Sequence, residues 1–129
     1  MNIKCNIGNL IFASMVCGGL GVPTIVAAAD SPLSFVADPS VYKVIAENDL
    51  FRVVLATWKP GQRDIAHSHP ANAAYRLGDC KVRVYGPDGK MTAEAEPKAG
   101  AINLQNPIAS HSLENISSKE CQVLIVERK

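Results

Sequence analysis

The sequence predicts an all-β fold, an antiparallel sandwich or barrel, and three observations support that prediction. Short runs rich in β-branched and aromatic residues recur along the chain with turns between them, at the spacing that strands have in sandwiches and barrels. No long stretch of helical periodicity separates these runs. They occupy about 100 residues, the size of one such unit. We therefore expect a single all-β domain.

The first 29 residues are expected to lie outside this domain. Lys4 precedes an uncharged stretch that contains an apolar run, and the stretch ends on three alanines, the last of which is Ala29. A basic start, an apolar middle and a small-residue end are typical of a secretory signal peptide. The alternative is an uncleaved membrane anchor, but glycines and a proline interrupt the roughly 20 apolar residues that a spanning helix needs. We expect cleavage after Ala29, a mature domain at 30–129, and a periplasmic or secreted protein.

The charge balance bears on the class of partner. The chain has 13 basic and 12 acidic residues, and removal of the leader takes away only Lys4, which leaves 12 of each. A neutral domain without a basic stripe offers no electrostatic surface for nucleic acid or for an anionic membrane. After signal cleavage we therefore expect small-molecule or protein partners, and neither nucleic acid nor membrane.

Three runs predict strands, at 51–58, 81–85 and 121–126. The first two end in turn sequences that contain proline and glycine. In the second run Val82 and Val84 alternate with Lys81 and Arg83, so the valines should face the core and the charged residues water. The third run is almost continuously apolar, which is typical of a strand buried on both faces. Only 38–48 has helical character, and 31–39 has the character of an extended lead-in.

Two cysteines, Cys80 and Cys121, remain after the leader is removed. A pair of cysteines in an exported protein is a disulfide candidate. Free cysteine buried on a strand is also common, so both readings stay open. Metal ligation by this pair is not favoured, because neither cysteine lies at short spacing from the other or from a histidine.

All three histidines of the chain lie in two segments, 61–70 and 111–115. Successive side chains of an extended strand point to opposite faces, so His67 and His69 share one face. A third imidazole from a distant part of the chain, His111, would complete a facial set of nitrogen ligands for a divalent metal.

These two segments resemble the two motifs of the cupin family, small double-stranded β-helix barrels of jelly-roll type. The first motif is G-x5-H-x-H-x(3,4)-E-x6-G and the second is G-x5-P-x-G-x2-H-x3-N. The residues that match them are Gly61, His67 and His69 in the first, and Gly100, His111 and Asn115 in the second. The resemblance covers 51–126. It implies a jelly-roll barrel with the metal site inside it, and a homodimer as one arrangement of the chain.

The sequence also departs from both motifs. The glutamate of the first motif is absent, since its two available positions hold Ala73 and Ala74. In the second motif Asn106 stands for the proline and Ile108 for the glycine. The fold expectation tolerates these changes, whereas the missing carboxylate leaves the identity of the metal open.

Three neutral imidazoles leave the charge of a divalent ion uncompensated and leave coordination positions open, so the site should attract anionic or chelating oxygen ligands. All-imidazole ligation suits zinc, copper, iron or nickel. Asn115 shares the face of His111, and we expect it to hold an imidazole or a bound water by hydrogen bond. Tyr75 is a further candidate for the cavity. Asp64 lies on the opposite face of an ideal strand and would become a ligand only through a bulge.

Three functional hypotheses follow. The first is a metal-dependent oxygenase or isomerase that acts on a small chelating molecule, although no pair of residues stands out as a dedicated acid and base. The second is a module that binds a metal or a small ligand without turning it over. The third is a barrel that has lost its metal and keeps the imidazoles as polar groups in a ligand cavity. The sequence alone does not choose between them or name a substrate.

Overall fold

The computed structural model describes residues 30–129, and the expected signal peptide at 1–29 lies outside the described residues. Within them the chain forms one short helix and nine strands. The elements are α1 (Ser34–Ala37), β1 (Tyr42–Glu47), β2 (Phe51–Trp58), β3 (His67–His69), β4 (Asn72–Arg76), β5 (Val82–Tyr85), β6 (Met91–Ala95), β7 (Ile102–Gln105), β8 (Ile108–Asn115) and β9 (Cys121–Arg128). No helix of this part of the chain is long and apolar enough to cross a membrane.

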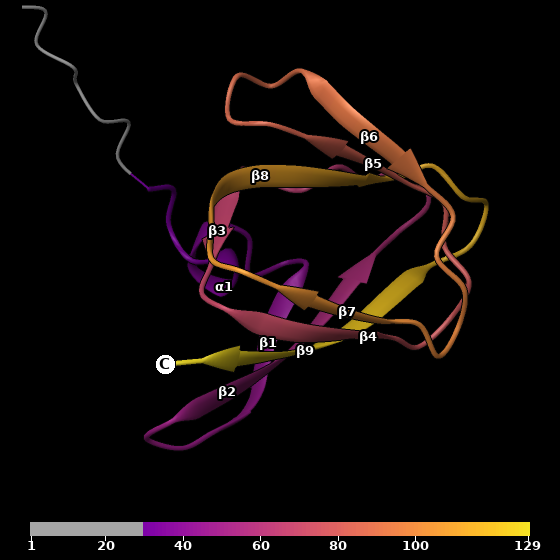
Figure 1. Cartoon of the computed structure of the whole chain (residues 1–129). Coiled ribbons are helices and arrows are strands. Elements are labelled where there is room, and N and C mark those ends of the chain that lie inside the picture. Colours follow the sequence, from indigo (N-terminus) through magenta and orange to yellow (C-terminus); the bar gives the residue numbers. More distant parts are fainter. Residues whose placement is uncertain (1–29) are drawn as a thin grey trace, which may run out of the picture.

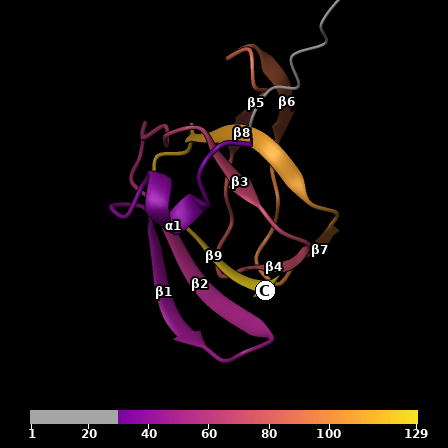
Figure 2. The ribbon, with the colours of Figure 1, turned by 90° about the vertical axis from the view of Figure 1, so that its left-hand side faces the viewer.

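The strands form two sheets that enclose one core. The larger sheet has the order β1-β2-β9-β4-β7 and the smaller one the order β3-β8-β5-β6, and every named pair is antiparallel. Figures 1 and 2 show the two layers facing each other, with α1 at one end of the barrel, beside β1 and β3. Strands that are distant in sequence, such as β2 and β9, lie side by side. The all-β prediction is confirmed.

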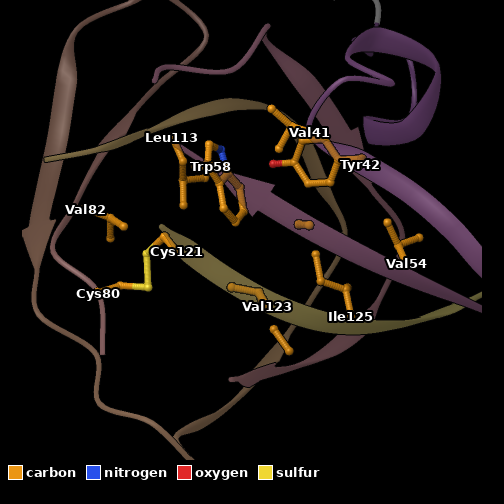
Figure 3. Close-up of a cluster of buried hydrophobic side chains, with 12 residues drawn as sticks. Val41, Tyr42, Val54, Trp58, Cys80, Val82, Leu113, Cys121, Val123 and Ile125 are labelled. Atoms are coloured by element: carbon orange, nitrogen blue, oxygen red, sulfur yellow. A yellow bond between two sulfur atoms is a disulfide. The ribbon is translucent and has the colours of Figure 1, made fainter. Parts of the chain in front are cut away.

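Alternating side chains on the central strands build the core. On β2 the residues Val54, Ala56 and Trp58 point inward, and on β9 Val123 and Ile125 meet them from the next strand. Figure 3 shows Val54 and Trp58 of β2 converging with Val123 and Ile125 of β9. β9 is therefore buried on one face only, which corrects the expectation of a strand covered on both sides.

The prediction for the strand at 81–85 is confirmed. Val82 is buried and Val84 packs against the core. The charged residues of this run lie on the outside, where Lys81 and Arg83 form ion pairs with Glu94 of β6. The period of two in this short run was therefore enough to assign its two faces correctly.

Two expectations for the start of the domain are wrong. The segment 38–48 is mostly strand β1, which pairs with β2 through residues such as Lys43, Val44 and Ala46. The only helix of the described residues is instead the single turn α1, inside the segment that was expected to be extended. Local helix propensity was weak at 38–48, so pairing with β2 decided the outcome there.

A disulfide between Cys80 and Cys121 connects the two sheets. Cys80 lies just before β5 of the smaller sheet and Cys121 begins β9 of the larger one. Their Cα atoms are 5.5 Å apart, and both residues are buried within the core shown in Figure 3. Of the two readings that the sequence left open, the structure has the bonded one.

The two motif glycines shape turns. Gly61 and Gly100 have φ angles of 74° and 81°, in the left-handed region that favours glycine. The amide of Gly61 also donates to the carbonyl of Asn115 at 2.8 Å. This bond fastens the turn that precedes β3 to the end of β8, the strand that carries the third histidine.

Candidate metal centre

The three histidines meet because β3 and β8 are antiparallel neighbours. In their register His67 lies directly opposite His111, and His69 projects from the same face of β3 two residues later. The ring centroids are 4.6 Å apart for His67 and His111 and 4.7 Å apart for His67 and His69. One ring nitrogen from each residue lies within 4.8 Å of the other two. The structure thus brings together the three residues that the sequence placed in the candidate site.

Hydrogen bonds at the back of two rings determine which nitrogens face inward. His67 Nδ1 lies 2.8 Å from the carbonyl oxygen of Ile65, and His69 Nδ1 lies 2.7 Å from Glu127 Oε1. A carbonyl and a carboxylate are acceptors, so both Nδ1 atoms carry hydrogen, and in the neutral form of each ring the lone pair then lies on Nε2. This is the arrangement in which metal-binding histidines are usually held.

The geometry of the Nε2 atoms fits a divalent cation. His67 Nε2 and His69 Nε2 are 3.0 Å apart, and two lone pairs at that distance repel unless a positive charge lies against them. Two nitrogen ligands at about 2.1 Å from one metal, separated by about 90°, would lie about 3.0 Å apart. In the described part of the chain His111 Nε2 is buried and has no hydrogen-bond partner. The residues present therefore fit a metal ion.

Burial keeps two of these imidazoles in the form that binds metal. Burial lowers the pKa of His67 to about 4, an effect that its bond to Ile65 only partly offsets. Burial, followed by the charges of the two neighbouring histidines, lowers the pKa of His111 to about 3. Both rings are consequently neutral at pH 7, so a metal would not have to displace protons from them.

Glu127 provides a negative charge behind the site rather than in it. It is fully buried and is the next inward position on β9 after Ile125. One carboxylate oxygen accepts from His69, and the other lies 3.7 Å from the guanidinium of Arg52. At the position of the missing motif glutamate, Ala74 points inward and supplies no oxygen. The charge of a bound cation would therefore be balanced through His69.

The sequence contained a signal for Glu127 that its apolar surroundings hid. Cys121, Val123 and Ile125 fix the inward phase of β9, and the same period of two makes Glu127 inward. A carboxylate on the core face of a strand needs a buried partner. Because 121–126 was expected to be buried on both faces, its alternation of inward and outward positions was not used, and Glu127 was missed.

A second buried carboxylate, Asp64, lies beside His67. Its Oδ2 accepts from the Tyr42 hydroxyl at 2.7 Å and from the Trp58 indole at 2.8 Å, and its Oδ1 accepts from the Leu113 amide at 2.7 Å. Burial raises the pKa of Asp64 to about 6 against the effect of these three bonds. Its bonds make Asp64 a support for the site and not a ligand.

Tyr42 connects this carboxylate to the histidines. Its hydroxyl lies 3.0 Å from His67 Nε2, and its ring is 4.7 Å from the His67 ring. Burial, then the nearby charge of Asp64, raises the pKa of Tyr42 well above its ordinary value, so the group remains a phenol and a donor. Sequence reasoning missed Tyr42 because it read 38–48 as helical, which concealed the inward position at the start of β1.

Two expected site residues lie elsewhere. The side-chain amide of Asn115 donates to the carbonyls of Trp58 and Lys119, and its oxygen accepts from Ser117. These bonds use the capacity of the side chain, so Asn115 closes the turn after β8 and does not hold an imidazole. Tyr75 occupies an outward position on β4 and is 43% exposed. It is not part of the cavity, because the inward positions of β4 are its even-numbered residues.

A cavity of about 330 Å³ adjoins the site. His69, His111 and Tyr42 lie on one side of it, and most of the remaining wall is apolar. The wall also includes Arg76, the last residue of β4. An imidazole-bound metal here would face a partly open space large enough for a small organic molecule.

No family model matches the sequence, and no curated protein matches it. Solved structures are similar in fold. A cupin domain from Bordetella pertussis Tohama I aligns with a TM-score of 0.63 and 16% identity over 79% of this chain and 99% of its own.

Two further solved structures agree with the first. A cupin family protein with a double-stranded β-helix fold from Methanocaldococcus jannaschii has a TM-score of 0.54 and 12% identity, over 68% of this chain and 78% of its own. A double-stranded β-helix domain protein from Klebsiella pneumoniae has a TM-score of 0.52 and 23% identity, over 67% of this chain and 75% of its own. Together with the two sheets and the three meeting histidines, these likenesses show that the chain has the cupin fold.

Proposed function

We propose that this protein is an exported metal-binding cupin that holds one divalent ion through the Nε2 atoms of His67, His69 and His111. The observation that carries the proposal is the direction of the lone pairs. Two rings are fixed from behind by a carbonyl and a carboxylate, and the inner nitrogen of the third is buried without a partner among the described residues. Zinc, copper, iron and nickel suit such a donor set.

The surroundings of the site support binding of a small oxygen-donor molecule. A bound divalent ion would polarise such a molecule through its open coordination positions. Tyr42 lies on the cavity wall and donates its hydroxyl hydrogen to Asp64, so its oxygen would accept a hydrogen bond from that molecule. The apolar wall would exclude water from the bound molecule.

A metal-dependent oxygenase or isomerase is the catalytic form of this proposal. It is supported by the buried Tyr42 and Asp64, which supply the proton-carrying pair that the sequence did not reveal. The alternative is a binder that holds the metal and its ligand without turnover. An oxygen-uptake and isomerisation screen on small chelating acids separates the two, and replacement of Tyr42 by phenylalanine should abolish turnover but retain metal.

Metal analysis of protein purified from its native compartment tests the site itself. We expect one metal per chain in the wild type and a loss of it in His67→Ala and His111→Ala variants. Ser68→Ala is the matched control, because Ser68 lies on the opposite face of the same strand. Equal metal content in the histidine variants and in the control would refute the proposal. A wild-type protein that stays metal-free at saturating metal concentrations would favour the third hypothesis, a barrel that has lost its metal.

Export to the periplasm or the medium is the second part of the proposal. The disulfide between Cys80 and Cys121 supports it, because such bonds persist in oxidising compartments. Fractionation of the source cells followed by mass measurement should find a mature chain that begins at Asp30. Full-length protein retained in the cytoplasm would contradict this part and leave the metal site untouched.

A further inference from the structure

Arg76 carries a positive charge into the cavity and has no anion to meet it. Its strand position is inward, in phase with Ala74, and its backbone is held by bonds to Gly100 and Ala101. The side chain lines the same cavity as His69 and His111. Across residues 30–129, its Nη1 is buried without a hydrogen-bond partner and no ion pair includes its guanidinium.

The cavity holds no acidic group that could neutralise this charge. None of the residues that line it is aspartate or glutamate. The two carboxylates nearest the histidines are engaged elsewhere: Asp64 with Tyr42, Trp58 and the Leu113 amide, and Glu127 with His69. Arg76 is half-buried, and a charged group whose Nη1 is buried without a partner carries a desolvation cost in the folded protein. Such a cost is typical of a group kept for a ligand.

We propose that Arg76 receives the carboxylate of a small organic acid while a second oxygen atom of that acid reaches the three-histidine centre. The inference rests on the proposed metal site and names the class of molecule that the site takes. Arginine presents a planar pair of N–H donors that matches a carboxylate. The cavity of about 330 Å³ has room for a small organic acid, and the apolar wall accommodates its carbon skeleton.

Calorimetric titration of the metal-loaded protein tests the assignment. The probes are glycolate, pyruvate, oxalate and succinate, with glycolamide and pyruvamide as neutral matches and inorganic phosphate as a carbon-free anion. We expect at least one carboxylate to bind, and its neutral amide to bind at least tenfold more weakly. Amides that bind as well as their acids would overturn the proposal, as would phosphate binding more tightly than every carboxylate.

Variants separate this proposal from the metal site. Arg76→Gln should weaken binding of the preferred acid at least tenfold while metal content stays at the wild-type value. Arg76→Lys should retain part of the affinity. The control is Arg83→Gln, which removes an arginine that is paired with Glu94 on the outer surface. A wild-type protein that binds no metal would refute the metal site. The acids can then still be titrated against the metal-free chain, which tests the role of Arg76 separately. Unchanged acid affinity in Arg76→Gln refutes the role of Arg76.

Stability of the ligand-free protein provides an independent readout. Because Arg76 lacks a partner, Arg76→Met should leave the melting temperature of the ligand-free protein unchanged or raise it. Addition of the acid should raise the melting temperature of the wild type but not that of Arg76→Met. A structural arginine would behave in the opposite way. A large fall in the melting temperature of ligand-free Arg76→Met would therefore contradict the proposal.

Discussion

Replacing Glu127 with glutamine should weaken metal binding while the barrel keeps its shape. The amide is isosteric with the carboxylate, and its oxygen can still accept from His69 Nδ1, so the ring need not turn. What is lost is the negative charge that lies behind the ring and balances the cation. Partners of this kind typically contribute 10- to 100-fold in metal affinity, which corresponds to about 1.4 to 2.7 kcal/mol.

A competition titration against a chromophoric chelator measures this change directly. We expect the metal Kd of Glu127→Gln to rise within that range while the stoichiometry remains one. Glu94→Gln is the control, because Glu94 forms its ion pairs at the surface, away from the histidines. A Kd that is the same in Glu127→Gln and in the wild type would refute the idea that Glu127 acts on the metal through His69.

Two further predictions concern stability. In the metal-stripped protein the free energy of unfolding should fall by about 1.4 kcal/mol for each pH unit between pH 6 and pH 4. In this range His67 and His111 each take up a proton on unfolding, because burial lowers their pKa values in the folded protein. Asp64 releases one proton on unfolding, because burial raises its pKa, so the net uptake is about one proton. Urea titrations at pH 6, 5 and 4 check this, and a flat or opposite trend would contradict it. Replacing Cys80 and Cys121 together by serine should lower the free energy of unfolding by up to about 4 kcal/mol, because the bond closes a loop of 41 residues and restricts the unfolded chain. An unchanged midpoint of urea denaturation would show that the bond does not restrict the unfolded chain.

The parts of the site that sequence reasoning found are those set by short-range periodicity. His67 and His69 share a face because a strand has a period of two, and that rule needs no tertiary information. Spacing within two motifs then identified His111 as their partner. The structure adds the reason that they meet, which is the antiparallel register of β3 with β8.

The parts that sequence reasoning missed depend on contacts across the barrel. Tyr42, Arg76 and Glu127 come from three strands of the larger sheet, and nothing in their local sequence states which of them face the histidines. Asn115 was placed on the correct strand but at its end, where the unpaired groups of a turn compete for its amide. Tyr75 was assigned to the cavity although it faces outward on β4. Pro70 interrupts the chain between His69 and β4, so the inward and outward positions of β4 could not be derived from the face on which His69 lies.

X-ray absorption spectroscopy on the metal-loaded protein tests the central claim most directly. We predict one metal per chain with three imidazole nitrogens at about 2.0 to 2.1 Å, and a first shell that loses one imidazole in His111→Ala but not in Ser68→Ala. A metal surrounded mainly by oxygen ligands, or a shell that is identical in wild type and His111→Ala, would contradict the account.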